Sequence, residues 1–200
     1  MATVIRVATA QDAAAILDIY APIVRETAIS FELAPPTVPE MQQRLEDTML
    51  QWPWLVCARE GEVWGYVYAT RHRARAAYQW SVDVSVYIRD GMRRTGIGRA
   101  LCTSLFGLLA LQQFHNCYAG ITLPNPGSVG LHEALGFRPV GVYRQVGYKQ
   151  SAWHDVGWWH LALPIERSSP TPPIAFATLV AQSGPWEAAL QAGASLLRVC

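Results

Sequence analysis

Apolar residues recur along this chain with two periods, two residues in some segments and three to four in others. In the run SVDVSVYI, residues 81–88, the even positions hold three valines and an isoleucine, while Asp83, Ser85 and Tyr87 occupy the odd positions. Such alternation predicts a strand that buries its even-numbered face. The next segment, residues 100–114, has leucines at helical spacing and predicts a helix to about residue 113.

The same reading along the chain predicts a series of strands and helices. The strands are expected at residues 3–9, 54–59, 63–70, 81–88, 116–123, 138–149 and 155–163, and the other helices at residues 12–24, 38–52 and 126–136. Pro22 is expected to end or kink the first helix. Three consecutive strands between residues 54 and 88 argue against a doubly wound fold, so the pattern predicts a mixed α/β sheet.

The character of the chain changes after Pro164. The segment ERSSPTPP has the composition of a linker, and the stretch that follows is too short for a domain. The sequence therefore predicts one domain over residues 1–166. Residues 167–200 form a proline-rich linker and a tail of unknown role, with room for one short helix from Pro185.

Charge and cysteine content exclude several classes of protein. The 200 residues carry a net charge of +1, which gives no general argument for binding nucleic acid or a membrane. The four cysteines form no C-x-x-C pair and no cluster with zinc spacing, so no metal site is expected. The first residues lack the apolar segment of a targeting signal, and no window reaches membrane-spanning length. A soluble, cytoplasmic protein is the expectation.

One polar motif stands between the strand at residues 81–88 and the helix after it. The turn RRTGIG, residues 93–98, joins two arginines to two glycines where a helix begins. Uncapped N–H groups in a first helical turn bind anions, and glycines let a ligand approach the backbone closely. The motif is neither a Walker A loop nor G-x-G-x-x-G, and by itself it is equally compatible with a structural turn.

Two motifs together resemble the GCN5-related N-acetyltransferase (GNAT) superfamily. The first is R-x-x-G-x-G at residues 93–98, and the second is N-x-x-S-x-x-x-H-x-x-x-G-F at residues 125–137. The segments QWPWLV, AYQWSVDVSVYI, SVGLHEALGF and SAWHDVGWW are also similar to the phosphinothricin acetyltransferase family over residues 4–164. The resemblance implies a mixed, mostly antiparallel sheet with two splayed parallel strands, flanked by helices.

The resemblance also implies that acetyl-CoA lies between the two splayed strands, with no metal. Backbone N–H groups near Tyr87 and Ile88 would polarise the thioester carbonyl. The turn would hold the pyrophosphate, and Asn125 would contact the pantetheine arm. The cofactor-binding residues implied are Val86, Tyr87, Ile88, Arg93, Arg94, Thr95, Gly96, Ile97, Gly98, Arg99, Asn125 and Ser128.

The resemblance implies two catalytic residues, Asp83 and His132. His132 would protonate or relay a proton to the thiolate leaving group. Asp83 aligns with the family's glutamate base but is one methylene shorter, so it would reach the amine directly or through a water. Two alternatives stay open: Asp83 is a structural aspartate, or His132 serves as the base through a water.

For the acceptor, the family's substrate class implies a small zwitterionic amino acid such as phosphinothricin. The predicted substrate-binding residues are Phe31, Arg75, Tyr78, Trp80 and Lys149. Methionine sulfone or sulfoximine is the alternative acceptor. An acetyl-CoA-binding protein with little catalysis is a different class of function, and an architectural protein is disfavoured by the two motifs. A homodimer is expected.

Overall fold

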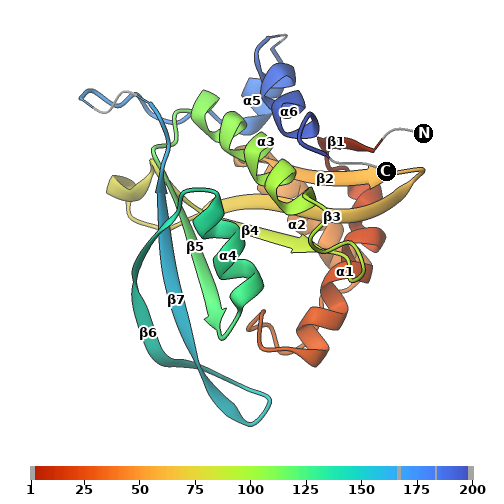
Figure 1. Ribbon diagram of the computed structural model, residues 1–200. Helices are drawn as coiled ribbons and strands as arrows, with labels where there is room; N and C mark the ends of the chain where they lie inside the picture. Colours follow the sequence, from red (N-terminus) through yellow and green to blue (C-terminus); the bar gives the residue numbers. More distant parts are fainter. Residues whose placement is uncertain (1–2, 166–167, 183, 198–200) are drawn as a thin grey trace.

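The computed structural model describes residues 3–165, 168–182 and 184–197, and Figure 1 shows how their helices and strands are arranged. The strands are β1 (Val4–Val7), β2 (Trp54–Arg59), β3 (Glu62–Arg71), β4 (Ser81–Ile88), β5 (Asn116–Leu123), β6 (Arg138–Lys149) and β7 (Ala152–Ala162). The helices are α1 (Ala13–Glu26), α2 (Val38–Gln51), α3 (Ile97–Leu111), α4 (Pro126–Ala134), α5 (Phe176–Val180) and α6 (Trp186–Ala194), with short 3₁₀ turns at Ala10–Asp12 and Ala76–Tyr78.

Among the described residues, the seven strands form one sheet in the order β1-β2-β3-β4-β5-β7-β6. Neighbouring strands are antiparallel except for β4 and β5, which are parallel. The mixed, mostly antiparallel sheet expected from the sequence is therefore confirmed. Glu60 and Gly61, in the turn between β2 and β3, both have positive φ.

The parallel pair separates almost as soon as it forms. Ser81 to Asp83 pair with Asn116 to Tyr118, and no further pairing joins the two strands in the described chain. Yet β4 stays paired with β3 as far as Ile88, and β5 stays paired with β7 as far as Leu123. Figure 1 shows β4 and β5 diverging, with α4 beside the opening.

The alternation in β4 decides which helices cover each face. Val82 and Val84 are buried in the cluster that includes Leu105 and Leu109 of α3. On the opposite face Tyr87 makes an edge-to-face contact with Tyr20 of α1, with ring centroids 5.3 Å apart. Asp83 shares this second face because it is an odd-numbered residue of the same strand.

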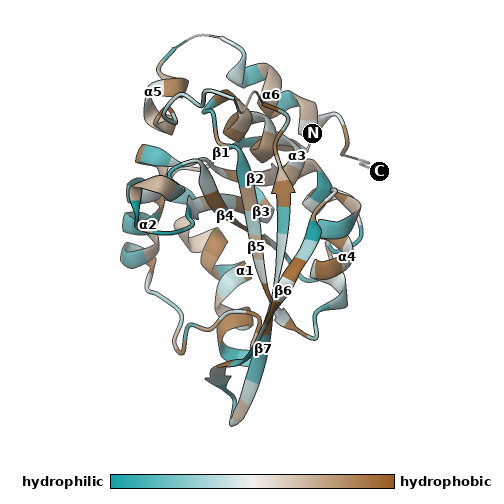
Figure 2. Ribbon diagram, turned by 90° about the vertical axis from the view of Figure 1, so that its left-hand side faces the viewer, coloured by the Kyte–Doolittle hydropathy of each residue, from teal (hydrophilic) through white to brown (hydrophobic). Residues whose placement is uncertain are grey.

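Helix α1 runs through Pro22 to Glu26, so the proline does not end the helix. The last strand begins three residues earlier than predicted, at Ala152, which lengthens its hairpin with β6. Figure 2 shows this hairpin projecting beyond the rest of the molecule.

The segment after Ser168 packs on the outer surface of α3. Phe176 and Leu190 are only 1% and 7% exposed and join the cluster around α3. The hydroxyl of Ser104 donates a hydrogen bond of 2.6 Å to the carbonyl of Leu190. The helix predicted from Pro185 is present as α6, whereas α5 was not predicted. The boundary at residues 166–167 stays a prediction and falls on two residues outside the described ranges.

A glycine allows α6 to approach α3, which leads to a prediction. A Cβ at Gly193 would overlap the carbonyl oxygen of Ala100 and the hydroxyl of Ser104. We expect Gly193→Ala to lower the free energy of unfolding by about 1–3 kcal/mol through overpacking, measured by urea denaturation. Gly130→Ala is the matched control, because Gly130 is also helical but a Cβ there would have no neighbouring atom within 4 Å. It should be neutral or stabilising by up to about 1 kcal/mol. Equal stability of the two variants would contradict the contact.

Candidate active site

The divergence of β4 and β5 opens a narrow cleft that reaches α4. Five predicted residues line it: Val86, Tyr87, Asn125, Ser128 and His132. The lining residues that the sequence analysis missed are Ile29, Val84, Ser85, Ala119, Gly120, Ile121 and Thr122. Most of the missed residues lie on β5, where only the pairing with β4 reveals which of them face the opening.

The glycine turn lies at the N-terminus of α3 and leaves it uncapped. Gly96 occupies the N-cap position with a φ of +89°, and no side chain accepts a hydrogen bond from the first turn. The helical ladder starts with the bond from the Ala100 N–H to the Gly96 carbonyl, so the N–H groups of residues 97–99 have no helical acceptor. These donors, together with the positive end of the helix dipole, form a site for an anion.

Further features of the turn support this geometry. Arg94, two residues before Gly96, also has positive φ, +66°. Turns that include left-handed residues can orient backbone N–H groups into a concave nest. The hydroxyl of Thr95 donates a 2.7 Å hydrogen bond to the carbonyl of Met92, which fixes the turn. Arg93, Arg94 and Arg99 are exposed around it.

Two predicted cofactor-binding residues can contribute through their backbone only. The side chain of Ile97 is buried in the cluster around α3, with 3% exposure. Ile88 packs against Gly65 and beside Gly98. Gly98 is itself close to α4, since a Cβ there would lie 3.0 Å from Leu131.

His132 lines the cleft and carries its ring proton on Nδ1. Its Nδ1 donates a 2.8 Å hydrogen bond to the carbonyl of Ser128, and its Nε2 is buried and finds no hydrogen-bond partner among the described residues. Burial lowers the pKa of His132, partly offset by that hydrogen bond. In the neutral imidazole with its proton on Nδ1, Nε2 is a hydrogen-bond acceptor. The acid role predicted from the sequence would instead need a proton to donate.

Asp83 is paired with a histidine that the sequence analysis did not single out. Its Oδ1 lies 2.6 Å from Nδ1 of His72, and the two side chains are 28% and 11% exposed. Burial raises the pKa of Asp83, while His72 and Arg73 oppose this shift. His72 comes directly after β3, in the arginine-rich stretch TRHRAR, where the arginines gave the stronger signal.

Of the predicted substrate residues, Tyr78 contacts this pair, with its ring centroid 6.1 Å from that of His72. Arg75 instead lines a separate hollow of about 350 Å³ together with Arg71 and Arg73. Arg73 is the arginine whose charge acts on Asp83, and its guanidinium lies 5.6 Å from the Trp158 ring.

Three further predicted substrate residues make contacts within the protein. The indole N–H of Trp80 donates a 2.7 Å hydrogen bond to the carbonyl of Thr171. Lys149 is 6% exposed and donates hydrogen bonds of 2.6 Å to the carbonyls of Val24 and Ser30, and burial lowers its pKa. Phe31 packs so closely on Gly147 that a Cβ there would overlap its ring. The contacts of Lys149 and Phe31 connect the β6–β7 hairpin to α1 and to the segment that follows it.

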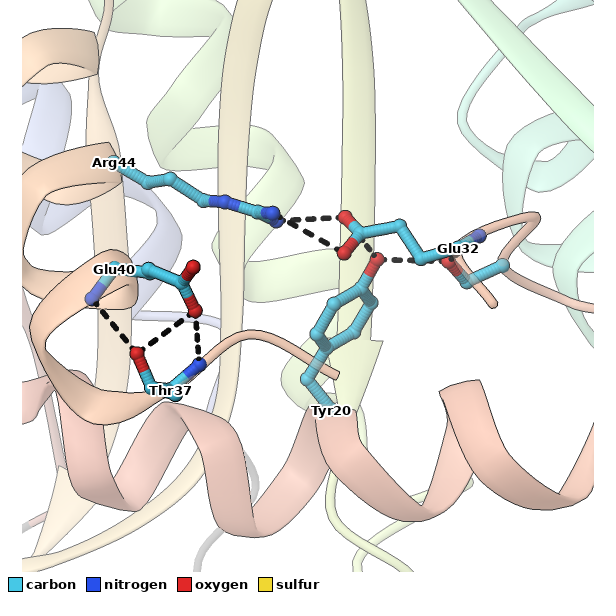
Figure 3. A network of polar contacts seen from close by, with 6 residues as sticks. Tyr20, Glu32, Thr37, Glu40 and Arg44 are labelled. Atoms are coloured by element: carbon cyan, nitrogen blue, oxygen red, sulfur yellow. Dashed lines mark hydrogen bonds and ion pairs between the residues drawn. The ribbon is translucent and has the colours of Figure 1, made fainter. Parts of the chain in front are cut away.

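A hollow of about 320 Å³ lies on the face of the sheet that carries Asp83. Its lining includes Tyr20, Arg44 and Thr70, and Thr70 is the residue of β3 that pairs with Asp83. Figure 3 shows the polar network beside it: Arg44 makes hydrogen bonds of 2.6 and 3.2 Å to Glu32, which also accepts a bond from the Tyr20 hydroxyl. The network holds the segment between α1 and α2 over this face.

The described cysteines are poor nucleophiles. Cys57, Cys102 and Cys117 are free and buried, and burial raises the pKa of Cys57 to about 11 and that of Cys102 to about 12. Cys200 lies outside the described residues. Nowhere in the described ranges do three or more metal-ligating side chains come together. The described helices also include none that is long and apolar enough to cross a membrane.

Comparison with known sequences connects this geometry to acetyl transfer. The family model described as "Acetyltransferase (GNAT) domain" matches residues 5–158. Phosphinothricin N-acetyltransferase of Streptomyces viridochromogenes is 43% identical over 155 residues, which cover 78% of this chain and 85% of that protein. The L-methionine sulfoximine/L-methionine sulfone acetyltransferase of Pseudomonas aeruginosa is 34% identical over 172 residues, covering 85% of this chain and all of that protein.

Solved structures agree with the sequence comparison. The phosphinothricin acetyltransferase of Sinorhizobium meliloti, in complex with AcCoA, has a TM-score of 0.79 and 31% identity over 88% of this chain and 99% of that one. A putative acetyltransferase from Salmonella typhimurium, with its cofactor acetyl-CoA, has a TM-score of 0.81 and 30% identity over 86% and 99% of the two chains.

Proposed function

Because this chain belongs to the acetyltransferase (GNAT) domain family, we propose that it transfers the acetyl group of acetyl-CoA to the amino group of a small amino acid-like acceptor. The observation that carries the proposal is the divergence of β4 and β5. It places an uncapped helix N-terminus beyond the end of β4, at Gly96, and a half-buried carboxylate, Asp83, at the point of separation.

The residues of the cleft fit acetyl-CoA. The uncapped N–H groups of residues 97–99 suit its pyrophosphate, and the exposed arginines of the turn add positive charge. Beyond Asp83 the edge of β4 that faces β5 has no strand partner in the part of the chain that the structure describes, so its N–H groups can polarise a carbonyl near Tyr87 and Ile88. When bound, acetyl-CoA supplies an activated acetyl thioester.

The acceptor is proposed to approach from the face that carries Asp83. The relatives named above act on phosphinothricin and on methionine sulfoximine or sulfone, which are zwitterions with a tetrahedral polar group. The loop with Arg73 and Arg75 supplies guanidinium groups for such anionic groups, and Tyr78 supplies an aromatic wall. Phosphinothricin is our first candidate, and methionine sulfoximine or sulfone is the second.

The two predicted catalytic residues are proposed to act on opposite sides of the opening. Asp83 belongs to the acceptor side, where the ammonium group must lose a proton. His132 reaches the cleft from α4, with Nε2 as an acceptor that orients a donor or a water there. The tautomer held by Ser128 disfavours the acid role that the resemblance implied for it.

We also propose a homodimer in the cytoplasm, where the acetyl-CoA needed for the reaction is a common metabolite. The β6–β7 hairpin supports the dimer because its apolar side chains are exposed. The exposed apolar residues on the hairpin are Val140, Val142, Tyr143, Val146, Tyr148 and Trp153. In Figure 2 apolar stretches alternate with polar ones along these two strands. Patches of this kind mark interaction surfaces.

The cofactor site can be tested at Gly98. Gly98→Asp adds a negative charge at the proposed pyrophosphate site, and we expect it to raise the acetyl-CoA dissociation constant at least about tenfold in calorimetry. Gly98→Ala is the control, because it makes the same contact with Leu131 without the charge, and should change the constant less than about threefold. Equal effects of the two substitutions would assign the loss to packing and remove the anion site.

The acceptor can be identified by measuring thiol release from acetyl-CoA with a panel of amino acids and analogues. We expect kcat/KM to be highest for phosphinothricin or for methionine sulfoximine or sulfone. An aminoglycoside and a peptide N-terminus serve as comparison acceptors. Tight acetyl-CoA binding without transfer to any amino acid of the panel would contradict the proposed acceptor class.

The oligomeric state can be tested by sedimentation equilibrium. The wild-type chain should sediment as a dimer, and the double variant Val140→Glu/Trp153→Glu as a monomer, because two charges would be buried without partners. Leu50→Glu is the control, since Leu50 is also an exposed apolar residue, at 57%, but lies on α2. A wild-type monomer would contradict the proposal.

A further inference from the structure

The contact between His72 and Asp83 fixes which nitrogen of the histidine carries a proton. A carboxylate can only accept, so the 2.6 Å contact to Oδ1 requires a proton on Nδ1 of His72. In the neutral ring the lone pair is then on Nε2. No hydrogen bond of Nε2 is present in the described residues, and the nitrogen is free to accept a proton.

Three aromatic rings hold His72 in this orientation. Tyr118 of β5 stacks on it with centroids 4.3 Å apart and an interplanar angle of 15°. Trp158 of β7 and Tyr78 meet it edge to face, at 6.0 and 6.1 Å. A ring restrained on these sides and bonded at Nδ1 loses little freedom when it acts, which is the usual requirement for a positioned base.

His72 stands where the strands separate. Asp83 and Tyr118, its hydrogen-bonding and stacking partners, are the last paired residues of β4 and β5. Trp158 also covers Gly120, which lines the cleft, because a Cβ at Gly120 would lie 3.1 Å from the indole. The Trp158 ring therefore contacts both His72 and the cleft residue Gly120. His72 lies on the face of the sheet assigned to the acceptor.

Asp83 by itself is less suited to accept the proton. Burial raises the pKa of Asp83, but His72 and Arg73 oppose this shift, and one of the two carboxylate oxygens is already occupied by His72. A carboxylate in this arrangement orients an imidazole and stabilises the imidazolium that forms, as in hydrolytic triads.

We propose that His72 is the general base of the acetyl transfer and that Asp83 acts through it as a positioning residue. This inference rests on the proposed function. One proton of the acceptor ammonium passes to Nε2 of His72, and the amine nitrogen forms the new bond to the acetyl carbon as the carbon–sulfur bond breaks. The second proton leaves the nitrogen for the thiolate, and His72 returns its proton to water.

The charged and titratable groups facing His72 come from four elements. They are Asp83 on β4, Arg73 on the same loop, Tyr78 on the 3₁₀ turn and Tyr118 on β5, and the indole of Trp158 on β7 is uncharged. Asp83 is the closest of them, so its removal should change the pH dependence most.

The test compares three variants of the full chain with the best acceptor of the panel. His72→Asn keeps an N–H donor at the position of Nδ1 and removes Nε2, so kcat should fall by about 10²- to 10⁴-fold, with loss of the rising limb of the pH profile of kcat/KM. Asp83→Asn should lower kcat and shift that limb. Asp83→Glu should also lower kcat, because a longer side chain displaces the imidazole.

Two controls separate catalysis from structure. His160→Gln removes the other imidazole beside Tyr118, 4.9 Å from its ring, and should leave kcat within about threefold of wild type. The acetyl-CoA dissociation constant should stay within about threefold in every variant. A fall in kcat under about threefold for His72→Asn, or full activity of Asp83→Glu, would assign the base to Asp83 and overturn the proposal.

A measurement without turnover distinguishes failure of this proposal from failure of the proposed function. In the ¹⁵N spectrum of the wild-type chain, the neutral imidazole of His72 should carry its proton on Nδ1 and none on Nε2, and Asp83→Asn should change that pattern. A proton on Nε2 would overturn the assignment of the base whichever acceptor is used. The correct tautomer with no transfer to any amine would instead count against the proposed function.

Discussion

The early end of the pairing between β4 and β5 is the constraint on which the site depends. Each strand keeps its outer partner, β3 or β7, for five more residues, so only the seam between them opens. Buried backbone groups need partners, and a seam without strand pairing leaves them available to a ligand. The turn before α3 follows the end of β4, and α4 follows the end of β5, so both N-termini lie near the same opening.

Most of the fold was predictable because it depends on local patterns. The alternation in SVDVSVYI gave both the strand and its two faces, and it placed Asp83 opposite the valines that contact α3. The helix expected at residues 38–52 is α2, which Thr37 caps, and the Glu40 carboxylate accepts a hydrogen bond from the Thr37 N–H. Pro22 does not end α1. A proline lacks the backbone N–H and therefore costs the helix one hydrogen bond, but the packing of α1 on the sheet outweighs this loss.

The sequence predicts those parts of the site in which a short motif acts through its own backbone. It does not predict the parts that form where segments distant in the chain come together. The uncapped turn at Gly96 is such a local feature. Lys149 and Trp80 looked like ligands, yet their partners are carbonyls more than 90 residues away, at Val24 and Thr171. His72 was missed because its importance comes from the strand register, which brings it next to Asp83 and Tyr118. Only the cross-strand pairing reveals that neighbourhood.

The packing of α6 on α3 has a consequence for how the chain is made. Phe176 and Leu190 complete the apolar cluster around the central helix, and they are synthesised after every strand of the sheet. Until these two residues have left the ribosome, the outer surface of α3 faces water. The sheet can therefore pair its strands during synthesis before this layer closes over α3.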